Sequence, residues 1–160
     1  MDRHRERMTL VQTRIYRPLT TVELRRLGDE GVIGPAPFAA YTVTPGLRRE
    51  HPGVDEEELE YLAFTDAVTT GLSGGDGGGG RDAVRVVAAA DVDDELVVPA
   101  VDGPLTAVHV TAPVARRQVA SFHVADAAGR RGPARAAADG IPELSWYDAT
   151  ELDVVVDLFG

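Results

Sequence analysis

Apolar and polar positions alternate along this chain with two different periods, and each period predicts its own kind of element. Residues 13–19 (TRIYRPL) alternate as a half-buried strand does, 38–43 indicate a second strand, and the valine-rich run 83–92 is typical of a buried strand. The segments 106–112 and 119–125 predict two more strands. Only six residues separate them, too few for a parallel crossover, so as neighbours they are expected to pair antiparallel.

A period of three to four residues marks the predicted helices. TVELRRLGDE (21–30) has a threonine to cap its start and a glycine beyond its end, and 45–51 begins on a proline. The longest helix is expected at about 55–72, where apolar side chains fall on two sides and predict burial on both. GPARAAADG (132–140) indicates a short helix, and the C-terminal segment carries a strand-like valine run at 154–156.

The predicted order, β-α-β-α-α-β-β-β-α-β, indicates an α+β fold with a mixed, mainly antiparallel sheet, helices packed largely on one face, and the long helix as the central one. The chain of 160 residues is expected to form a single domain at 13–160 behind a flexible N-terminal tail at 1–12. Met1 and Met8 are both candidates for the first residue of the protein. GGDGGGG (74–80) predicts a glycine-rich loop rather than a phosphate cradle, because it leads into a strand and not into a helix.

Composition narrows the classes of function. The formal net charge of −10 disfavours binding to nucleic acid or to an anionic membrane, because phosphate contacts need a basic face. The absence of cysteine excludes disulfides and thiol chemistry. No apolar run has the length of a membrane span, and no apolar signal region follows the charged N-terminus, so a cytoplasmic protein is expected. All sixteen basic residues are arginine and asparagine is absent, which indicates a GC-rich genome; a halophile's surface would be similarly acidic.

Two histidines are candidates for a shared site. His109 and His123 lie in the two neighbouring predicted strands, and a hairpin about Arg116 would place them directly opposite each other on one face. Such a pair can bind a metal ion or titrate as a unit; the alternative is two hydrogen-bonded, inert side chains. No carboxylate lies at ligand spacing, and neither HxH nor HExxH occurs, so no metal site and no cofactor is predicted.

Two serine motifs predict no nucleophile, and no catalytic residue is assigned. GLSGG (71–75) has the residues of a nucleophile elbow, but it follows a helix, whereas the elbow follows a strand. Ser121, His123 and Asp126 have the residue types of a triad, but neighbours on one strand do not bring three side chains to one point.

Six carboxylates crowd the start of the long helix, in VDEEELEYLAFTDA. Asp55 is suited to be the N-cap, and the glutamates at 56–58 complement the helix dipole, which explains most of the cluster without chemistry. Glu60 and Asp66 remain. Asp66 lies on an apolar stripe, where a carboxylate needs a partner, and we expect this partner to be an arginine such as Arg14 or a tyrosine hydroxyl.

Arginine pairs and a Trp-Tyr pair complete the binding candidates. Arginine recognises phosphate or carboxylate in a bidentate manner, although in an acidic chain it also meets the protein's own carboxylates. Exposed aromatic side chains anchor partners, whereas in a chain with few aromatics they also hold a segment to the core. The candidate binding residues are Arg14, Tyr16, Glu60, Asp66, His109, His123, Trp146 and Tyr147.

Four segments, RIYRPLTTVELRRL, FAAYTVTPGLRRE, DEEELEYLAFTDA and ELSWYDATEL, resemble an uncharacterised family, a domain of unknown function, of small proteins from high-GC Gram-positive bacteria. The resemblance covers residues 13 to about 152, and DEEELEYLAFTDA is its most specific part. It implies a cytoplasmic, single-domain protein and assigns no catalytic residue.

Two functions follow as expectations. The first is a non-catalytic binding or regulatory module for a protein partner or a small ligand, because no nucleophile, metal set or phosphate loop is found. The second is a small, hydrolase-like enzyme that uses an acid of the long helix (Glu57, Glu60 or Asp66) with one of the two sheet histidines as base. Oligomeric state is not predicted.

Overall fold

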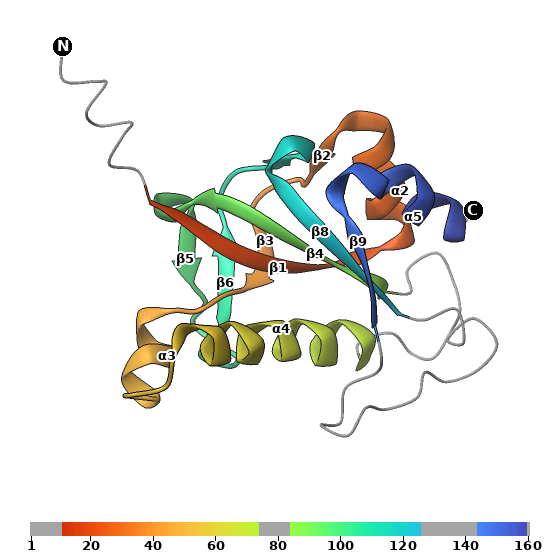
Figure 1. Cartoon of the computed structure of the whole chain (residues 1–160). Helices are drawn as coiled ribbons and strands as arrows, with labels where there is room; N and C mark the ends of the chain where they lie inside the picture. The colour runs from red at the N-terminus through yellow and green to blue at the C-terminus, as the bar shows by residue number, and fades with distance from the viewer. Residues whose placement is uncertain (1–10, 74–83, 126–143, 160) are drawn as a thin grey trace, which may run out of the picture.

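The computed structural model describes residues 11–73, 84–125 and 144–159 (Figure 1). The predicted glycine-rich loop at 74–80 and the predicted short helix at 132–140 lie outside the described residues, as does most of the predicted tail at 1–12. The last two residues of that tail are described, and the first strand begins at the second of them, Gln12.

A seven-stranded sheet forms the centre of the molecule, with the strand order β5-β6-β3-β1-β4-β8-β9 and every neighbouring pair antiparallel. Its strands are β1 (Gln12–Thr20), β3 (Phe38–Tyr41), β4 (Val84–Asp93), β5 (Val97–Pro99), β6 (Ala107–Val110), β8 (Val119–Ala125) and β9 (Leu144–Asp148). A second, two-stranded sheet pairs β2 (Val32–Ile33) with β7 (Val114–Ala115). The helices are α2 (Thr21–Glu30), α3 (Pro45–Glu50), α4 (Glu56–Ser73) and α5 (Leu152–Leu158).

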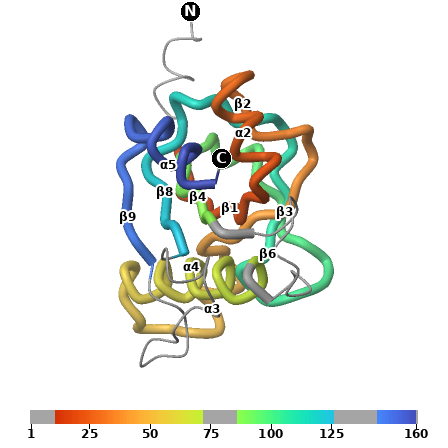
Figure 2. Tube along the Cα trace, turned by 90° about the vertical axis from the view of Figure 1, so that its right-hand side faces the viewer, coloured from red at the N-terminus to blue at the C-terminus, as the bar shows by residue number. Residues whose placement is uncertain are grey.

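The sheet is covered by helices on both faces. Figure 1 shows α4 below the sheet and α2 and α5 above it, and the second view keeps α3 with α4 on the lower side (Figure 2). We call the two sides the α4 face and the α2/α5 face. The α+β class, the mainly antiparallel sheet and the long helix are confirmed, whereas the helices do not pack largely on one face: buried residues of α2 and α5 join one cluster and those of α4 the other.

Successive residues of β1 and β4 point to opposite faces, as the pleat of a strand requires. Ile15 and Leu19 of β1 belong to the larger hydrophobic cluster, which includes buried side chains of α2 and α5. Tyr16, between them, belongs to the smaller cluster under α4. The smaller cluster consists of Tyr16, Tyr41, Ala63, Ala67, Val68, Val87 and Ala89.

The long helix is buried on one side only, so the prediction of burial on two sides is wrong. Leu59, Ala63 and Ala67 face the sheet and are at most 3% exposed, whereas Tyr61 is 46% exposed and Leu62 is 36% exposed. The apolar pattern misled because the outer stripe of α4 is not covered by a further layer in the described part of the chain.

The C-terminal valine run is a helix, α5, and not the strand that its composition predicts. The side chain of Asp148 accepts a hydrogen bond from the Thr150 amide, and Glu151 Oε1 accepts one from the Asp148 amide, which turns the chain through a short 3-10 turn into α5. Leu152 and Val155, three residues apart, are then both fully buried. Burial at helical spacing therefore overrides the strand propensity of valine.

The strands β6 and β8 do not form the predicted hairpin. β3, β1 and β4 lie between them in the sheet, and the connection passes through β7, which pairs with β2. The length of a connection limits which pairings are possible, but it does not require that two successive strands pair.

Candidate functional site

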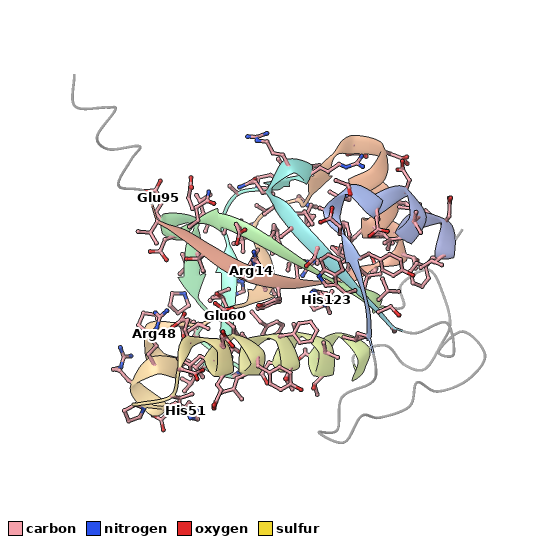
Figure 3. All side chains as sticks on the ribbon, in the orientation of Figure 1. Arg14, Arg48, His51, Glu60, Glu95 and His123 are labelled. Carbon is pink, nitrogen blue, oxygen red and sulfur yellow. The ribbon has the colours of Figure 1, made fainter. Side chains whose placement is uncertain are left out.

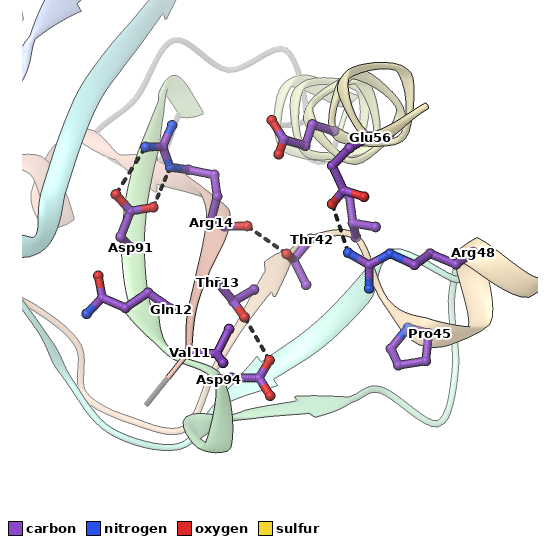
Figure 4. Close-up of a pocket in the computed structure, with 12 residues that line it drawn as sticks. Val11, Gln12, Thr13, Arg14, Thr42, Pro45, Arg48, Glu56, Asp91 and Asp94 are labelled. Atoms are coloured by element: carbon purple, nitrogen blue, oxygen red, sulfur yellow. Dashed lines mark hydrogen bonds and ion pairs between the residues drawn. The ribbon is translucent and has the colours of Figure 1, made fainter. Parts of the chain in front are cut away.

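A groove of about 620 Å³ opens where the start of β1 and the end of β4 meet α3 and the first turns of α4 (Figure 4). Its walls carry apolar side chains, among them Val11, Val43 and Pro45. Charged side chains of both signs also line it: Arg14, Arg48, Glu56, Glu60, Asp91 and Asp94.

The central contact of the groove is an ion pair between two neighbouring strands. Arg14 of β1 and Asp91 of β4 are register partners, so their side chains leave the sheet on the same face. Arg14 donates from Nε to Asp91 Oδ1 at 2.7 Å and from one terminal nitrogen to Asp91 Oδ2 at 3.0 Å. Both side chains are 38% exposed. The hydrogen bond to Asp91 raises the pKa of Arg14, against the opposing effect of burial.

Glu60 and Tyr16 complete this part of the site. In Figure 3, Glu60 lies on α4 beneath Arg14. Tyr16 is buried, and burial raises the pKa of its phenol; the negative charge of Glu60 raises it further, while Arg14 lowers it. No hydrogen bond or ion pair joins the Glu60 side chain to another residue in the described segments. The structure thus brings together three predicted binding residues: Arg14, Tyr16 and Glu60.

The rim of the groove is fixed by further hydrogen bonds. Arg48 of α3 pairs with Glu56 of α4 at 2.8 Å. The hydroxyl of Thr13 donates to Asp94 Oδ1 at 2.8 Å, and the hydroxyl of Thr42 donates to the Arg14 carbonyl oxygen at 2.6 Å. These contacts hold β1, β4, α3 and α4 in place around the opening.

Local capping positions the two helices that line the groove. The Thr44 hydroxyl accepts a hydrogen bond from the Leu47 amide at 3.1 Å, and Pro45 occupies the first turn of α3. Asp55 Oδ1 accepts one from the Glu58 amide at 2.9 Å, which confirms the predicted N-cap role of Asp55. The first turns of α4 therefore present their acids beside the groove.

His123 lies further along the α4 face, on β8. Its ring stands edge-on to Phe64 of α4, with 4.8 Å between the ring centroids, and Phe64 in turn meets Tyr16 at 5.5 Å. Burial lowers the pKa of His123, and the positive charge of Arg14 lowers it further. A series of ring contacts therefore runs from Tyr16, the neighbour of Arg14, to β8.

Two neighbours of His123 complete the surroundings of that ring. Its Nε2 lies 3.2 Å from Ser121 Oγ, so these two strand neighbours do meet; Asp126, the third residue of the rejected triad, lies outside the described residues. Trp146 on β9 is the register partner of His123 and is 61% exposed.

His109 does not meet His123, so the predicted pair is wrong. The two residues belong to β6 and β8, which are four steps apart in the strand order. At a strand spacing of about 4.8 Å, the two backbones are separated by roughly 19 Å. The register that would have placed them opposite each other requires the hairpin that does not form. Among the described residues, no three His, Asp or Glu side chains gather as metal ligands.

Asp66 and Tyr147 lie away from the groove. Asp66 Oδ2 accepts a hydrogen bond from the hydroxyl of Thr106 at 2.7 Å, so the expected partner, Arg14 or a tyrosine, is wrong. The contact nevertheless holds the helix to the sheet as expected, because Thr106 directly precedes β6. Tyr147 packs against the larger cluster on the α2/α5 face.

Sequence reasoning missed Asp91 of β4 and Asp94, which directly follows that strand. Asp91 and Asp94 belong to the segment ADVDDE that ends the valine-rich strand, and they were not selected as site residues. The available signal was a carboxylate at an inward position of an otherwise apolar strand, because such a group needs a partner on a neighbouring strand.

In the described part of the chain, the site contains fixed charges, and no acid of α4 contacts a histidine. Of the three helix acids, Asp66 is bound to Thr106, Glu57 is exposed, and Glu60 faces the Arg14 side of the groove. In the described residues, no hydrogen bond or ion pair joins any of the three to a histidine.

Comparison with known proteins gives a family but no activity. No curated protein and no solved structure matches the chain. Among the described residues, no helix combines the length and the apolar character needed to cross a membrane. Residues 13–156 match the profile of a family of unknown function (DUF6912), which covers most of the chain. The chain therefore belongs to this family of unknown function.

Proposed function

We propose that this protein is a non-catalytic binding module that takes a small polar ligand in the groove around Arg14. The observation that carries the proposal is a groove of about 620 Å³ in which both arginines are already held by hydrogen bonds to carboxylates. Pockets of this size suit small molecules, and preorganised groups reduce the cost of binding.

The setting of the function is part of the proposal. The net charge of −10 supports a ligand other than nucleic acid or an anionic membrane. The exclusive use of arginine, together with the resemblance noted above, supports an origin in a high-GC Gram-positive bacterium and a cytoplasmic location. A regulatory role would follow if the bound ligand changed a surface that a protein partner recognises.

The enzymatic alternative receives less support. It needs a helix carboxylate within hydrogen-bond reach of a histidine, and the described residues contain no such contact. We therefore assign the helix acids to binding and to structure.

A titration with small molecules tests the proposal. We would follow backbone amide chemical shifts while adding amines, amino acids, carboxylates and phosphates one at a time. At least one class is expected to give saturable shifts confined to the start of β1, the end of β4, α3 and the first turns of α4. The absence of saturable shifts for every class, or shifts elsewhere only, would overturn the proposal.

Paired variants then identify the groove as the site. Arg14→Met removes the central charge, and Arg117→Met is the matched control, because Arg117 is exposed and does not line the groove. Affinity should change for the first and stay unchanged for the second. Arg14→Lys keeps the charge and loses the bidentate geometry, so it provides a folded comparison if Arg14→Met is unstable.

A further inference from the structure

We infer that the groove around Arg14 binds an organic cation, that is, a small molecule with an ammonium or guanidinium group and an alkyl portion. This inference rests on the proposed binding function and names the ligand class of the same site. It follows from the charges that remain after the internal ion pairs of the groove are accounted for.

Both arginines of the groove are already engaged by carboxylates. Arg14 gives two hydrogen bonds to the two oxygens of Asp91, at 2.7 and 3.0 Å. Arg48 lies 2.8 Å from Glu56 Oε2. A bidentate arginine–carboxylate pair uses the same donor fork that would recognise an anionic ligand. The arginines are therefore poorly placed to attract a free carboxylate or phosphate.

Two carboxylates of the groove form no direct ion pair with an arginine in the described segments, although the charge of Arg14 also acts on one of them, Glu60. Glu60 makes no hydrogen bond or ion pair in the described segments, yet it faces the groove from α4 (Figure 3). Among the described residues, the Asp94 carboxylate accepts a hydrogen bond only from the neutral hydroxyl of Thr13, through one of its two oxygens. The groove thus contains two positive and four negative side chains, and the two that form no ion pair in the described segments are both negative. A cationic ligand would satisfy them, whereas an anionic ligand would add to the repulsion.

The electrostatic field of the whole protein also favours a cation over an anion. A net charge of −10 raises the local concentration of cations near the surface and lowers that of anions. This general attraction alone would not choose a site. The choice comes from the groove, where unpaired carboxylates and an enclosing wall occur together.

The wall favours an organic cation over a metal ion. Val11, Val43 and Pro45 provide apolar surface on which the alkyl part of an amine can lie. A hard divalent cation instead needs several oxygen ligands at short range, and no three acidic or histidine side chains gather in that way among the described residues. A volume of about 620 Å³ also exceeds what a single ion requires.

Isothermal titration calorimetry with chosen probes tests the inference. Agmatine and spermidine represent organic cations, succinate represents organic anions, and Mg²⁺ represents metal ions. At least one of the two amines is expected to bind saturably with a stoichiometry near one, and succinate is expected not to bind. Glu60→Gln should weaken amine binding by roughly tenfold or more, the usual effect of losing a hydrogen bond to a charged group.

A matched variant separates the groove from diffuse attraction. Glu57→Gln makes the same change of charge on the same helix, but Glu57 is exposed and does not line the groove. Its effect on amine binding should stay within about twofold, since an exposed charge outside the groove is screened by water and salt. Asp94→Asn, on the other side of the groove, should weaken binding as Glu60→Gln does.

The outcomes also separate this inference from the proposed function. If the two glutamate variants weaken amine binding equally, the attraction is diffuse and the inference fails. If Mg²⁺ binds with the same dependence on Glu60, the ligand is a metal ion and the inference fails. Binding of succinate but of neither amine would overturn the ligand class and leave the binding module intact. If neither these probes nor any member of the wider panel of small molecules binds, both the proposed function and this inference are wrong.

Discussion

A single hydrogen bond, from the Thr106 hydroxyl to Asp66 Oδ2 at 2.7 Å, joins α4 to the residue before β6. Thr106 is 1% exposed, so water cannot easily replace its hydroxyl. We expect Thr106→Val to lower the free energy of unfolding by about 1–3 kcal/mol, because the substitution keeps the shape and leaves Asp66 without its partner. Urea denaturation measures this loss. Thr70→Val, at an exposed position of the same helix, is the control, and equal effects of the two variants would contradict the assignment.

Also at the scale of single residues, the lowered pKa of His123 predicts how the stability of the fold depends on pH. Burial and the charge of Arg14 lower its pKa in the folded protein, whereas the unfolded chain takes up the proton near its ordinary value of about 6.5. Stability from this group is therefore present above that pH and is lost as pH falls towards the folded pKa. Urea unfolding from about pH 7.5 to about pH 5.5 should show this decrease.

Replacing each histidine separates this effect from other titrations. His123→Gln should flatten part of the decrease in stability, whereas His109→Gln, at an exposed position of β6, should leave the slope unchanged. A slope that is the same in both variants would show that His123 is not the group responsible.

At the scale of elements, the pattern of buried residues in α5 distinguishes a helix from a strand and can be tested by substitution. In a strand, Leu152 and Val154 would share a face, whereas in α5 the buried pair is Leu152 and Val155. Leu152→Ala should cost about 2–5 kcal/mol of unfolding free energy, and Val155→Ala should also be destabilising. Val154→Ala should change it by less than about 0.5 kcal/mol, because Val154 is half exposed. A large loss for Val154→Ala would contradict the helix.

Elements whose ends are encoded locally could be predicted, and pairings between distant segments could not. Thr20 caps α2 and Gly31 ends it in the left-handed conformation, as the sequence indicated, because caps involve residues three or four apart. The partner of β6 depends on where β3 lies in the completed sheet, and no local pattern specifies that. The valine run of α5 is a similar case, since its helix depends on a core that other segments form.

At the scale of the whole molecule, the candidate site shows the same contrast between features encoded locally and features that depend on the pairing of distant segments. Glu60 was identified as an acid that helix capping does not explain and Arg14 as a possible partner for a helix acid, and the fold does bring these two to one groove, with Tyr16 beside them. The sequence signalled that Asp91 needs a partner, but the identity of that partner, Arg14, depends on the register of two strands far apart in sequence. The histidine pair failed for the same reason, since it required a strand pairing that the sheet does not have.

The two hydrophobic clusters share β1 and β4, and this predicts a single unfolding transition. Ile15 and Tyr16 are consecutive residues that belong to opposite clusters, so neither layer can come apart without disturbing the same strand. Urea unfolding followed by the fluorescence of Trp146, the only tryptophan, and by far-UV circular dichroism should give coincident midpoints. Ala67→Asp, which places a charge beneath α4, should shift both midpoints equally. Separate midpoints, or loss of helix signal before any change in fluorescence, would instead show that α4 and its cluster form an independent unit. Independent unfolding of α4 would therefore contradict the expectation of a single domain, because that expectation requires the two clusters to unfold together with the strands they share.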